Sequence, residues 1–233
     1  MSLPSFLSAI LLFGIYACTT SSANSAKTKS TQNNSNQKVL VELFTSQGCS
    51  SCPPADKLIS NLAQTDTDLI VLSFHVDYWD RLGWKDAFSN HAFTLRQEQY
   101  VEALHAESAY TPEAVVQGQF EMVGSNRNGI SAALNKIKNQ NNNVQLNATA
   151  TVNSAFVMVH YEINEAKPNQ QVLAALVQTH ASTAIQRGEN SGVQLEGYNV
   201  VRSFETIALA QKKGDIKLNL PPDLKRDNAS VVV

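Results

Sequence analysis

The stretch Cys-Ser-Ser-Cys-Pro-Pro, residues 49–54, closely follows the apolar run Val39 to Phe44. Two thiols separated by two residues can close a small disulfide ring. A thiol at a helix N-terminus has a lowered pKa, because the backbone dipole stabilises its thiolate. Such a pair suits thiol–disulfide exchange. The same spacing also serves a static disulfide or half of a zinc site, so the motif leaves these readings open.

Hydrophobic periodicity around the cysteines predicts alternating strands and helices. Val39 to Thr45 is a β-prone run suited to a buried strand, and apolar residues recur at helical spacing from Ala55 to Leu62. We expect further strands at 69–76, 114–117 and 120–123 and further helices at 93–106 and 130–138. The resulting order over residues 38–139, β-α-β-α-β-β-α, resembles the thioredoxin fold, which carries a C-x-x-C pair between its first strand and first helix.

The second half of the chain is rich in short β-prone runs. Strands are expected at 144–151, 155–163, 172–179, 200–208 and 216–220. Several short strands bounded by turns suggest a small β-sandwich-like domain over residues 144–221. We expect residues 222–233 to form a loose tail. The predicted fold class is therefore α/β, with a thioredoxin-like domain followed by a β-rich one.

The N-terminus has the pattern of an export signal. Residues 7–16 form an apolar run that is too short to span a bilayer, and 15–18, Ile-Tyr-Ala-Cys, is similar to a bacterial lipobox. Residues 1–18 are thus predicted to be a signal peptide of lipoprotein type, with Cys18 lipidated; plain secretion is the alternative. Thr19 after the cysteine favours the outer membrane, and the polar residues 19–37 suit a flexible tether. We expect an exported, periplasmic protein that meets the membrane only through its lipid anchor.

Composition excludes several function classes. The 233 residues carry a formal net charge of −2 and no cluster of lysine or arginine, so nucleic acid is not an expected partner. No pattern indicates a cofactor, and no second cysteine pair exists for tetrahedral zinc. With Cys18 lipidated or removed, Cys49 and Cys52 are the remaining cysteines. So short a loop adds little stability, which favours a reactive pair whose partners are protein thiols or disulfides in the cell envelope.

Five residues are candidates for the chemistry of exchange. Cys49, with its sulfur towards solvent, is the expected nucleophile, and Cys52, one turn inside the helix, is the expected resolving thiol. Glu42 lies in an otherwise apolar strand, where a buried carboxyl could take the proton from Cys52; it could equally point outward or make an ordinary hydrogen bond. Thr111-Pro112 precedes the third strand, where the predicted element order favours a cis proline that faces the disulfide.

A loop at the end of the second predicted strand gathers aromatic and acidic residues. Asp77, Tyr78, Trp79 and Trp84 follow this strand, and ligand sites in α/β sheets collect at the carboxyl ends of strands. We predict that these four residues bind substrate; the alternative is a loop held together by aromatic packing. The polar segment 187–192 could contact the redox face, or it could be an ordinary turn.

Residues 41–56, Val-Glu-Leu-Phe-Thr-Ser-Gln-Gly-Cys-Ser-Ser-Cys-Pro-Pro-Ala-Asp, strongly resemble an uncharacterised bacterial family of exported thioredoxin-like proteins, domain-of-unknown-function family 1223. Segments 74–80, 82–86 and 110–112 fit the same family. The resemblance implies a thioredoxin-like domain with an appended β domain, and no settled activity. The Ser-Ser dipeptide between the cysteines differs from that of thioredoxin, so the direction of electron flow stays open.

A metal carrier or binding module on the same fold is the alternative function. Two thiolates and His75 could hold a soft cation such as Cu(I). A cis proline facing the sulfurs would hinder such binding. A structural disulfide in a non-catalytic envelope protein is a further alternative.

Overall fold

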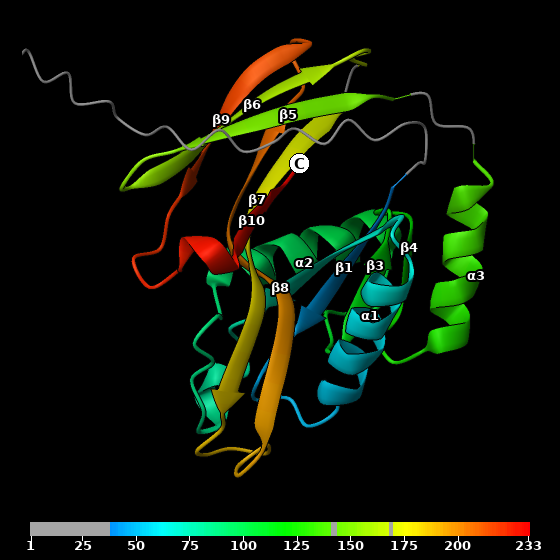
Figure 1. Cartoon of the computed structure of the whole chain (residues 1–233). Helices are drawn as coiled ribbons and strands as arrows, with labels where there is room; N and C mark the ends of the chain where they lie inside the picture. Colours follow the sequence, from blue (N-terminus) through cyan, green and yellow to red (C-terminus); the bar gives the residue numbers. More distant parts are fainter. Residues whose placement is uncertain (1–37, 141–143, 168–169) are drawn as a thin grey trace, which may run out of the picture.

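The computed structural model describes residues 38–140, 144–167 and 170–233. These residues form a mixed α/β fold with a seven-stranded mixed sheet, a three-stranded antiparallel sheet and few helices (Figure 1). The predicted signal peptide, Cys18 and tether lie outside the described residues. Within the described ranges, no helix is long and apolar enough to cross a membrane.

The elements of the first half agree with those expected from periodicity. They are β1 (Val39–Thr45), α1 (Pro53–Thr65), β2 (Leu69–His75), the short 3₁₀ helix η1 (Asp80–Leu82), α2 (His91–Leu104), β3 (Glu113–Val116), β4 (Phe120–Val123) and α3 (Arg127–Lys138). Asparagine side chains cap two of the helices: Asn90 accepts from the N–H of Ala92 at the start of α2, and Asn126 accepts from that of Gly129 in α3. β1 pairs in parallel with β2 and antiparallel with β3.

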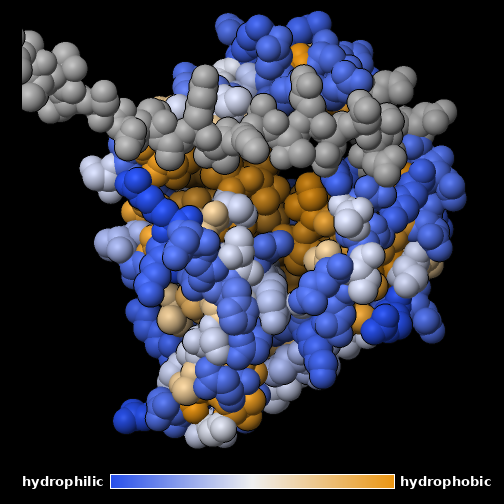
Figure 2. Space-filling view, viewed as in Figure 1, coloured by the Kyte–Doolittle hydropathy of each residue, from blue (hydrophilic) through white to orange (hydrophobic). Residues whose placement is uncertain are grey.

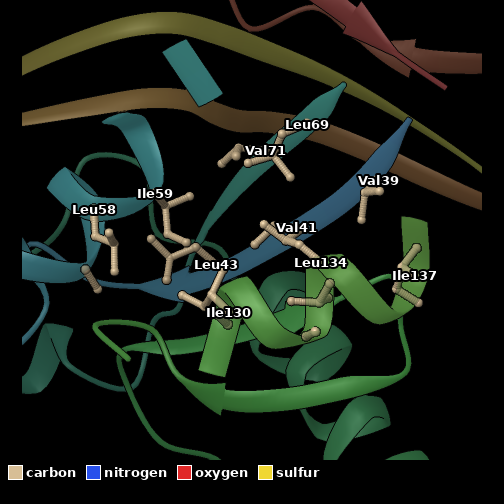
Figure 3. Packing of buried hydrophobic residues seen from close by; sticks show 14 residues of the cluster. Val39, Val41, Leu43, Leu58, Ile59, Leu69, Val71, Ile130, Leu134 and Ile137 are labelled. Carbon is tan, nitrogen blue, oxygen red and sulfur yellow. The ribbon is translucent and has the colours of Figure 1, made fainter. Parts of the chain in front are cut away.

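Strand β1 is buried on both faces of the sheet. Its side chains alternate, so Val39, Val41 and Leu43 pack against buried residues of α1 and α3 (Figure 3). Leu40 and Phe44 point to the opposite face, where α2 contributes Phe93 to a second apolar cluster. The helices therefore cover both faces of the sheet. The residues that follow the end of β1 lead into the start of α1.

The expected strands of the second half form, but they do not build a separate sandwich. They are β5 (Leu146–Val152), β6 (Phe156–Ile163), β7 (Gln171–Ala184), β8 (Gln194–Ala208), β9 (Lys213–Asn219) and β10 (Ala229–Val232), with the 3₁₀ helix η2 (Arg226–Asn228). β8 pairs with β2 through Ser73 and Val200, so β8, β7 and β10 extend the first sheet. The open edge of β2 explains this difference, because an unpaired strand edge accepts a further strand.

The remaining three strands, β5, β6 and β9, form a second sheet that shares an apolar cluster with β7. Val159 of β6 and Ile216 of β9 belong to this cluster together with Leu176 of β7. In Figure 2, hydrophobic residues gather across the upper middle of the molecule, below the three-stranded sheet, while hydrophilic residues cover most of the rest of this face. Sandwich-like packing is thus present, but one of its layers belongs to the main sheet.

The tail at 222–233 is not loose. β10 pairs antiparallel with β7, with Val231 opposite Leu176. Ahead of it, Asn228 Oδ1 accepts from the N–H of His180 at 3.0 Å, and Asn228 Nδ2 donates to the His180 carbonyl at 2.7 Å. The expectation of a loose tail is therefore wrong, because strand pairing between segments far apart in sequence leaves no local periodicity.

Truncation after Asn228 tests this role of the tail. Removing residues 229–233 deletes β10 and uncovers apolar surface of β7, so the free energy of unfolding should fall by about 2 kcal/mol. Urea denaturation of the full and truncated chains measures the change. Equal midpoints for the two chains would restore the interpretation of a loose tail.

Candidate functional site

Cys49 and Cys52 form a disulfide between the end of β1 and the start of α1. Cys52 is the N-cap residue of α1, and Pro53 and Pro54 occupy the first turn, where backbone N–H groups have no partner within the helix. Both cysteines have 0% of their surface exposed. The prediction that the Cys49 sulfur points to solvent is therefore wrong, and the neighbours that cover the disulfide define the site.

The Thr111–Pro112 segment lies beside the cysteine loop (residues 46–52). Its peptide bond is cis, as the predicted element order favoured. Ser51 Oγ donates to the Thr111 carbonyl in a long hydrogen bond of 3.5 Å. The structure thus brings together two candidate segments that are 60 residues apart in sequence.

The two tryptophans border the cysteine loop. Trp84 Nε1 donates to Gln47 Oε1 at 3.1 Å, and Trp79 Nε1 donates to Thr111 Oγ1 at 2.8 Å. Gly48 packs closely on Trp79, because a Cβ added at this glycine would lie 3.2 Å from the Trp79 Cβ. Trp79 therefore connects the cysteine loop to the Thr111–Pro112 segment, and Trp84 contacts Gln47, two residues before Cys49.

Asp77 and Tyr78, the other two predicted substrate-binding residues, are bonded to α2 instead. Asp77 Oδ1 accepts from Thr94 Oγ1 at 2.6 Å, and Tyr78 Oη donates to Gln97 Oε1 at 3.2 Å. Burial raises the pKa of Tyr78 to about 12. These side chains hold the loop that presents Trp79.

The turn between β7 and β8 reaches the cysteine loop. Asn190 Nδ2 donates to the carbonyls of Gln47 at 2.9 Å and of Cys49 at 3.0 Å. Glu189 Oε2 accepts from the N–H of Ser50 at 3.2 Å. Segment 187–192 therefore contacts the cysteine loop, which is one of the two possibilities that the sequence left open.

A buried ion pair supports the cysteine loop from the end of β2. His75 Nδ1 lies 2.7 Å from Asp86 Oδ2, which also accepts from the N–H of Gln47 at 2.8 Å. Burial opposes both charges, but the attraction between the two groups outweighs it, so the pKa of Asp86 is lowered and that of His75 is raised. His75 is thus engaged in a structural pair within the fold.

Asp56 is the carboxyl one helical turn after Cys52. Its N–H donates to the Cys52 carbonyl at 3.1 Å, so the two residues occupy neighbouring positions on one side of α1. Thr45 Oγ1 donates to Asp56 Oδ2 at 3.2 Å. Burial raises the pKa of Asp56 to about 6, although His75 and the Thr45 hydroxyl oppose the shift. A group with this pKa can accept a proton near neutral pH.

Glu42 is buried, with 1% of its surface exposed, but on the other side of the sheet. Its Oε1 accepts from Arg96 Nη2 at 2.8 Å and from Tyr100 Oη at 2.5 Å, both on α2. Strand alternation is the reason: Leu43 faces α1, so Glu42 faces α2. The arrangement does not bring Glu42 to the disulfide.

A second buried acid follows the cis proline. Glu113 has no exposed surface, and its Oε2 accepts from Gln97 Nε2 at 2.6 Å, while Oε1 has no hydrogen-bond partner. Burial raises the pKa of Glu113 to about 7. It pairs across strands with Phe44, whose side chain belongs to the α2 cluster, so Glu113 points to the same face as Glu42.

Sequence reasoning gave Asp56 no role, and it considered Asn190 only as part of segment 187–192. Asp56 stands in the quoted motif, four residues after Cys52, and helical spacing alone could have placed it beside the resolving cysteine. No helical spacing could place Asn190, because it lies 141 residues after Cys49 in the sequence. Asn190 contacts Cys49 because β7 and β8 join the main sheet.

A small cavity of about 20 Å³ adjoins the site. Gln47, Asp56, His75 and Thr183 are among the residues that line it, which is room for one water molecule between polar groups. Across the part of the chain that the structure describes, no group of three or more His, Cys, Asp or Glu side chains is arranged to hold a metal ion.

Comparisons with known proteins agree with this description. The chain is similar to a crystal structure of a protein from Agrobacterium tumefaciens, with 29% identity, 80% of each chain covered and a TM-score of 0.63. It shares its fold with HBP35 of Porphyromonas gingivalis at 12% identity, covering 84% of this chain and 68% of that one, with a TM-score of 0.56. Curated proteins gave no match. A family model matches residues 40–233, and the chain therefore belongs to the family described as "Protein of unknown function (DUF1223)".

Proposed function

We propose that this chain is a thiol–disulfide oxidoreductase of thioredoxin-like arrangement, in which Cys49 and Cys52 exchange electrons with protein thiols. The observation that carries the proposal is the disulfide at the N-terminus of α1, beside the Thr111–Pro112 segment. Further support comes from the strand order β2-β1-β3-β4, with α1 and α3 packed on one face and α2 on the other.

The proposed reaction transfers two electrons. A partner thiolate attacks the Cys49 sulfur and forms a mixed disulfide, while the Cys49–Cys52 bond breaks and Cys52 leaves as a thiolate that takes up a proton. The second partner thiol then loses its proton and attacks the partner sulfur, which releases Cys49 as a thiolate. The partner dithiol becomes a disulfide, and the chain gains two thiols. The reverse sequence reduces a partner disulfide.

Asp56, and not Glu42, is assigned the proton transfer. Asp56 lies one turn from Cys52 and has a pKa of about 6, whereas Glu42 is bonded to Arg96 on the other face. A carboxyl with this pKa can take the proton from Cys52 when Cys52 attacks, and return it when Cys52 leaves.

The surroundings of the disulfide suit a protein partner. The backbone at Thr111 can pair with an extended partner segment, and Trp79 and Trp84 supply aromatic surface beside the cysteine loop. Asp77 and Tyr78 orient Trp79 by holding its loop on α2.

The proposed location is the bacterial cell envelope. The apolar run at residues 7–16 and the lipobox-like segment that ends at Cys18 support export and lipid anchoring at the outer membrane. An oxidising compartment is where a disulfide persists and where protein thiols need such a catalyst.

Copper carriage, the alternative, has less support. It requires His75 beside both sulfurs, but His75 Nδ1 is held 2.7 Å from Asp86 Oδ2 in a buried pair. We therefore favour redox exchange.

Two measurements test the proposal. The reduction potential of the Cys49–Cys52 pair in glutathione buffers should lie between about −270 and −120 mV, the range of catalytic pairs. Cys52→Ala should accumulate mixed disulfides with envelope proteins, because no resolving thiol remains, and Cys49→Ser should accumulate none. A potential below about −300 mV, together with no trapped partner, would indicate a structural disulfide.

The role of Asp56 predicts a change in the pH profile. When Cys49 carries glutathione in a mixed disulfide, the free Cys52 thiol attacks that disulfide. In the unmodified chain, the rate of this attack should rise with pH, with an apparent pKa near 6. Asp56→Asn should slow this step on the order of 100-fold at pH 7, because the proton acceptor is gone. Glu113→Gln is the matched control, since it neutralises a buried acid on the α2 face. Equal slowing in both variants would contradict the assignment.

Asp56→Asn should also change stability with pH. The folded pKa of Asp56, about 6, lies above its ordinary value of 3.8, so the folded state binds this proton more tightly than the unfolded state. Stability from this group is fully present below about pH 4 and is lost as pH rises through 6. Relative to the unmodified chain, Asp56→Asn should therefore gain free energy of unfolding between pH 4 and 7. Denaturant titrations at both pH values measure this, and a pH-independent difference would contradict it.

A further inference from the structure

The turn between β7 and β8, residues 185–193, covers the cysteine loop; we call it the hairpin tip. Figure 1 shows it at the same end of the molecule as the connection between β1 and α1. Its backbone closes on itself, since Gly192 N donates to the Ile185 carbonyl at 2.8 Å and Ile185 N donates to the Val193 carbonyl at 3.0 Å. The hairpin tip is thus a preformed unit that rests on the site.

Asn190 holds the hairpin tip on the cysteine loop. Its side chain donates to the carbonyls of Gln47 and Cys49, at 2.9 and 3.0 Å, and is 7% exposed, whereas its neighbours Glu189 and Ser191 are exposed. Removing this amide would take one donor from the buried Gln47 carbonyl and would leave the Cys49 carbonyl with the Cys52 N–H, at 3.3 Å, which disfavours the closed arrangement.

The other contacts of the hairpin tip are few. Glu189 accepts from the N–H of Ser50 at the surface, and Gly188, at φ +80°, lies against the Trp84 side chain. The side chains at 186–189 and 191–193 are exposed. Ile185, at the base of the hairpin tip, is 2% exposed and stays in the core. Residues 186–193 bury little apolar surface beyond it, so this part can open without unfolding the rest of the protein.

Exchange requires that a thiolate reach a disulfide sulfur, yet both cysteines are fully covered in the closed arrangement. We propose that the hairpin tip is a lid latched by Asn190, and that this lid selects which thiols reach Cys49. The proposal rests on the proposed function. A partner opens the lid by replacing its contacts. It supplies N–H donors to the carbonyls of Gln47 and Cys49, and an acceptor to the N–H of Ser50. An extended peptide backbone presents spaced N–H and C=O groups that can replace these contacts together, whereas dithiothreitol has two hydroxyl groups and no such array.

Reduction of the native disulfide by dithiothreitol tests the latch. Asn190→Ala should raise the second-order rate constant at pH 7 about tenfold, the effect of losing two ordinary hydrogen bonds from the closed state. Asn190→Asp should raise it at least as much, since an ionised carboxylate has no N–H to donate. Ser191→Ala, at an exposed position in the same turn, should stay within about twofold. An unchanged rate in Asn190→Ala overturns the proposal.

Selectivity is tested with a reduced two-cysteine peptide of extended sequence. Because the peptide displaces the hairpin tip itself, Asn190→Ala should change its rate far less than the rate of dithiothreitol. Equal acceleration of both reductants would overturn the lid as a selective element.

The chain truncated after Asn228 separates local opening from global unfolding. It should be less stable than the full chain without a change at the hairpin tip. If the truncated chain is reduced as fast as Asn190→Ala, unfolding explains the rate and the lid is overturned.

The two proposals fail in different ways. Acceleration in Asn190→Ala with a reduction potential outside the catalytic range overturns the redox function but leaves the latch. A potential within that range, without acceleration, overturns the lid but leaves the redox function.

Discussion

The double-sided burial of β1 is the constraint on which the rest of the structure depends. All seven of its residues pair in register with β2, and four of them pair with β3 on the other edge. With neighbours on both edges and helices on both faces, β1 can neither shift nor turn over, because a slip of one residue would exchange the two faces. The cysteine loop leaves the end of this strand, so its position is determined by the most constrained element of the fold.

Polar groups complete the site where the strands end. The Asp86 carboxylate binds both His75 and the N–H of Gln47, and the Gln47 carbonyl in turn binds Asn190. Three distant parts of the chain thus share one buried network around the disulfide. A network of this kind resists rearrangement while all its members are satisfied, and loosens when one is withdrawn. Under the proposed function, a partner reaches the disulfide by replacing these contacts.

Two acids with raised pKa values show how the sheet separates chemical roles. Asp56 lies on the α1 side, one turn from Cys52, and Glu113 lies on the α2 side, directly after Pro112. Burial raises the pKa of each into the range from about 6 to about 7, where a carboxyl can exchange protons at neutral pH. Position relative to Cys52, and not pKa alone, singles out Asp56 for proton transfer.

Local pattern in the sequence determined the elements and the C-x-x-C motif. Hydrophobic periodicity predicted the helices and most strands, and the cysteine spacing predicted the disulfide, because both depend on neighbours within a few residues. Tertiary structure decided the rest. The face that Glu42 occupies, the pairing of β8 with β2 and the seating of Asn190 on Cys49 all depend on contacts between distant parts of the chain. Such contacts are chosen by the burial of whole sheets, for which a short stretch of sequence carries no signal.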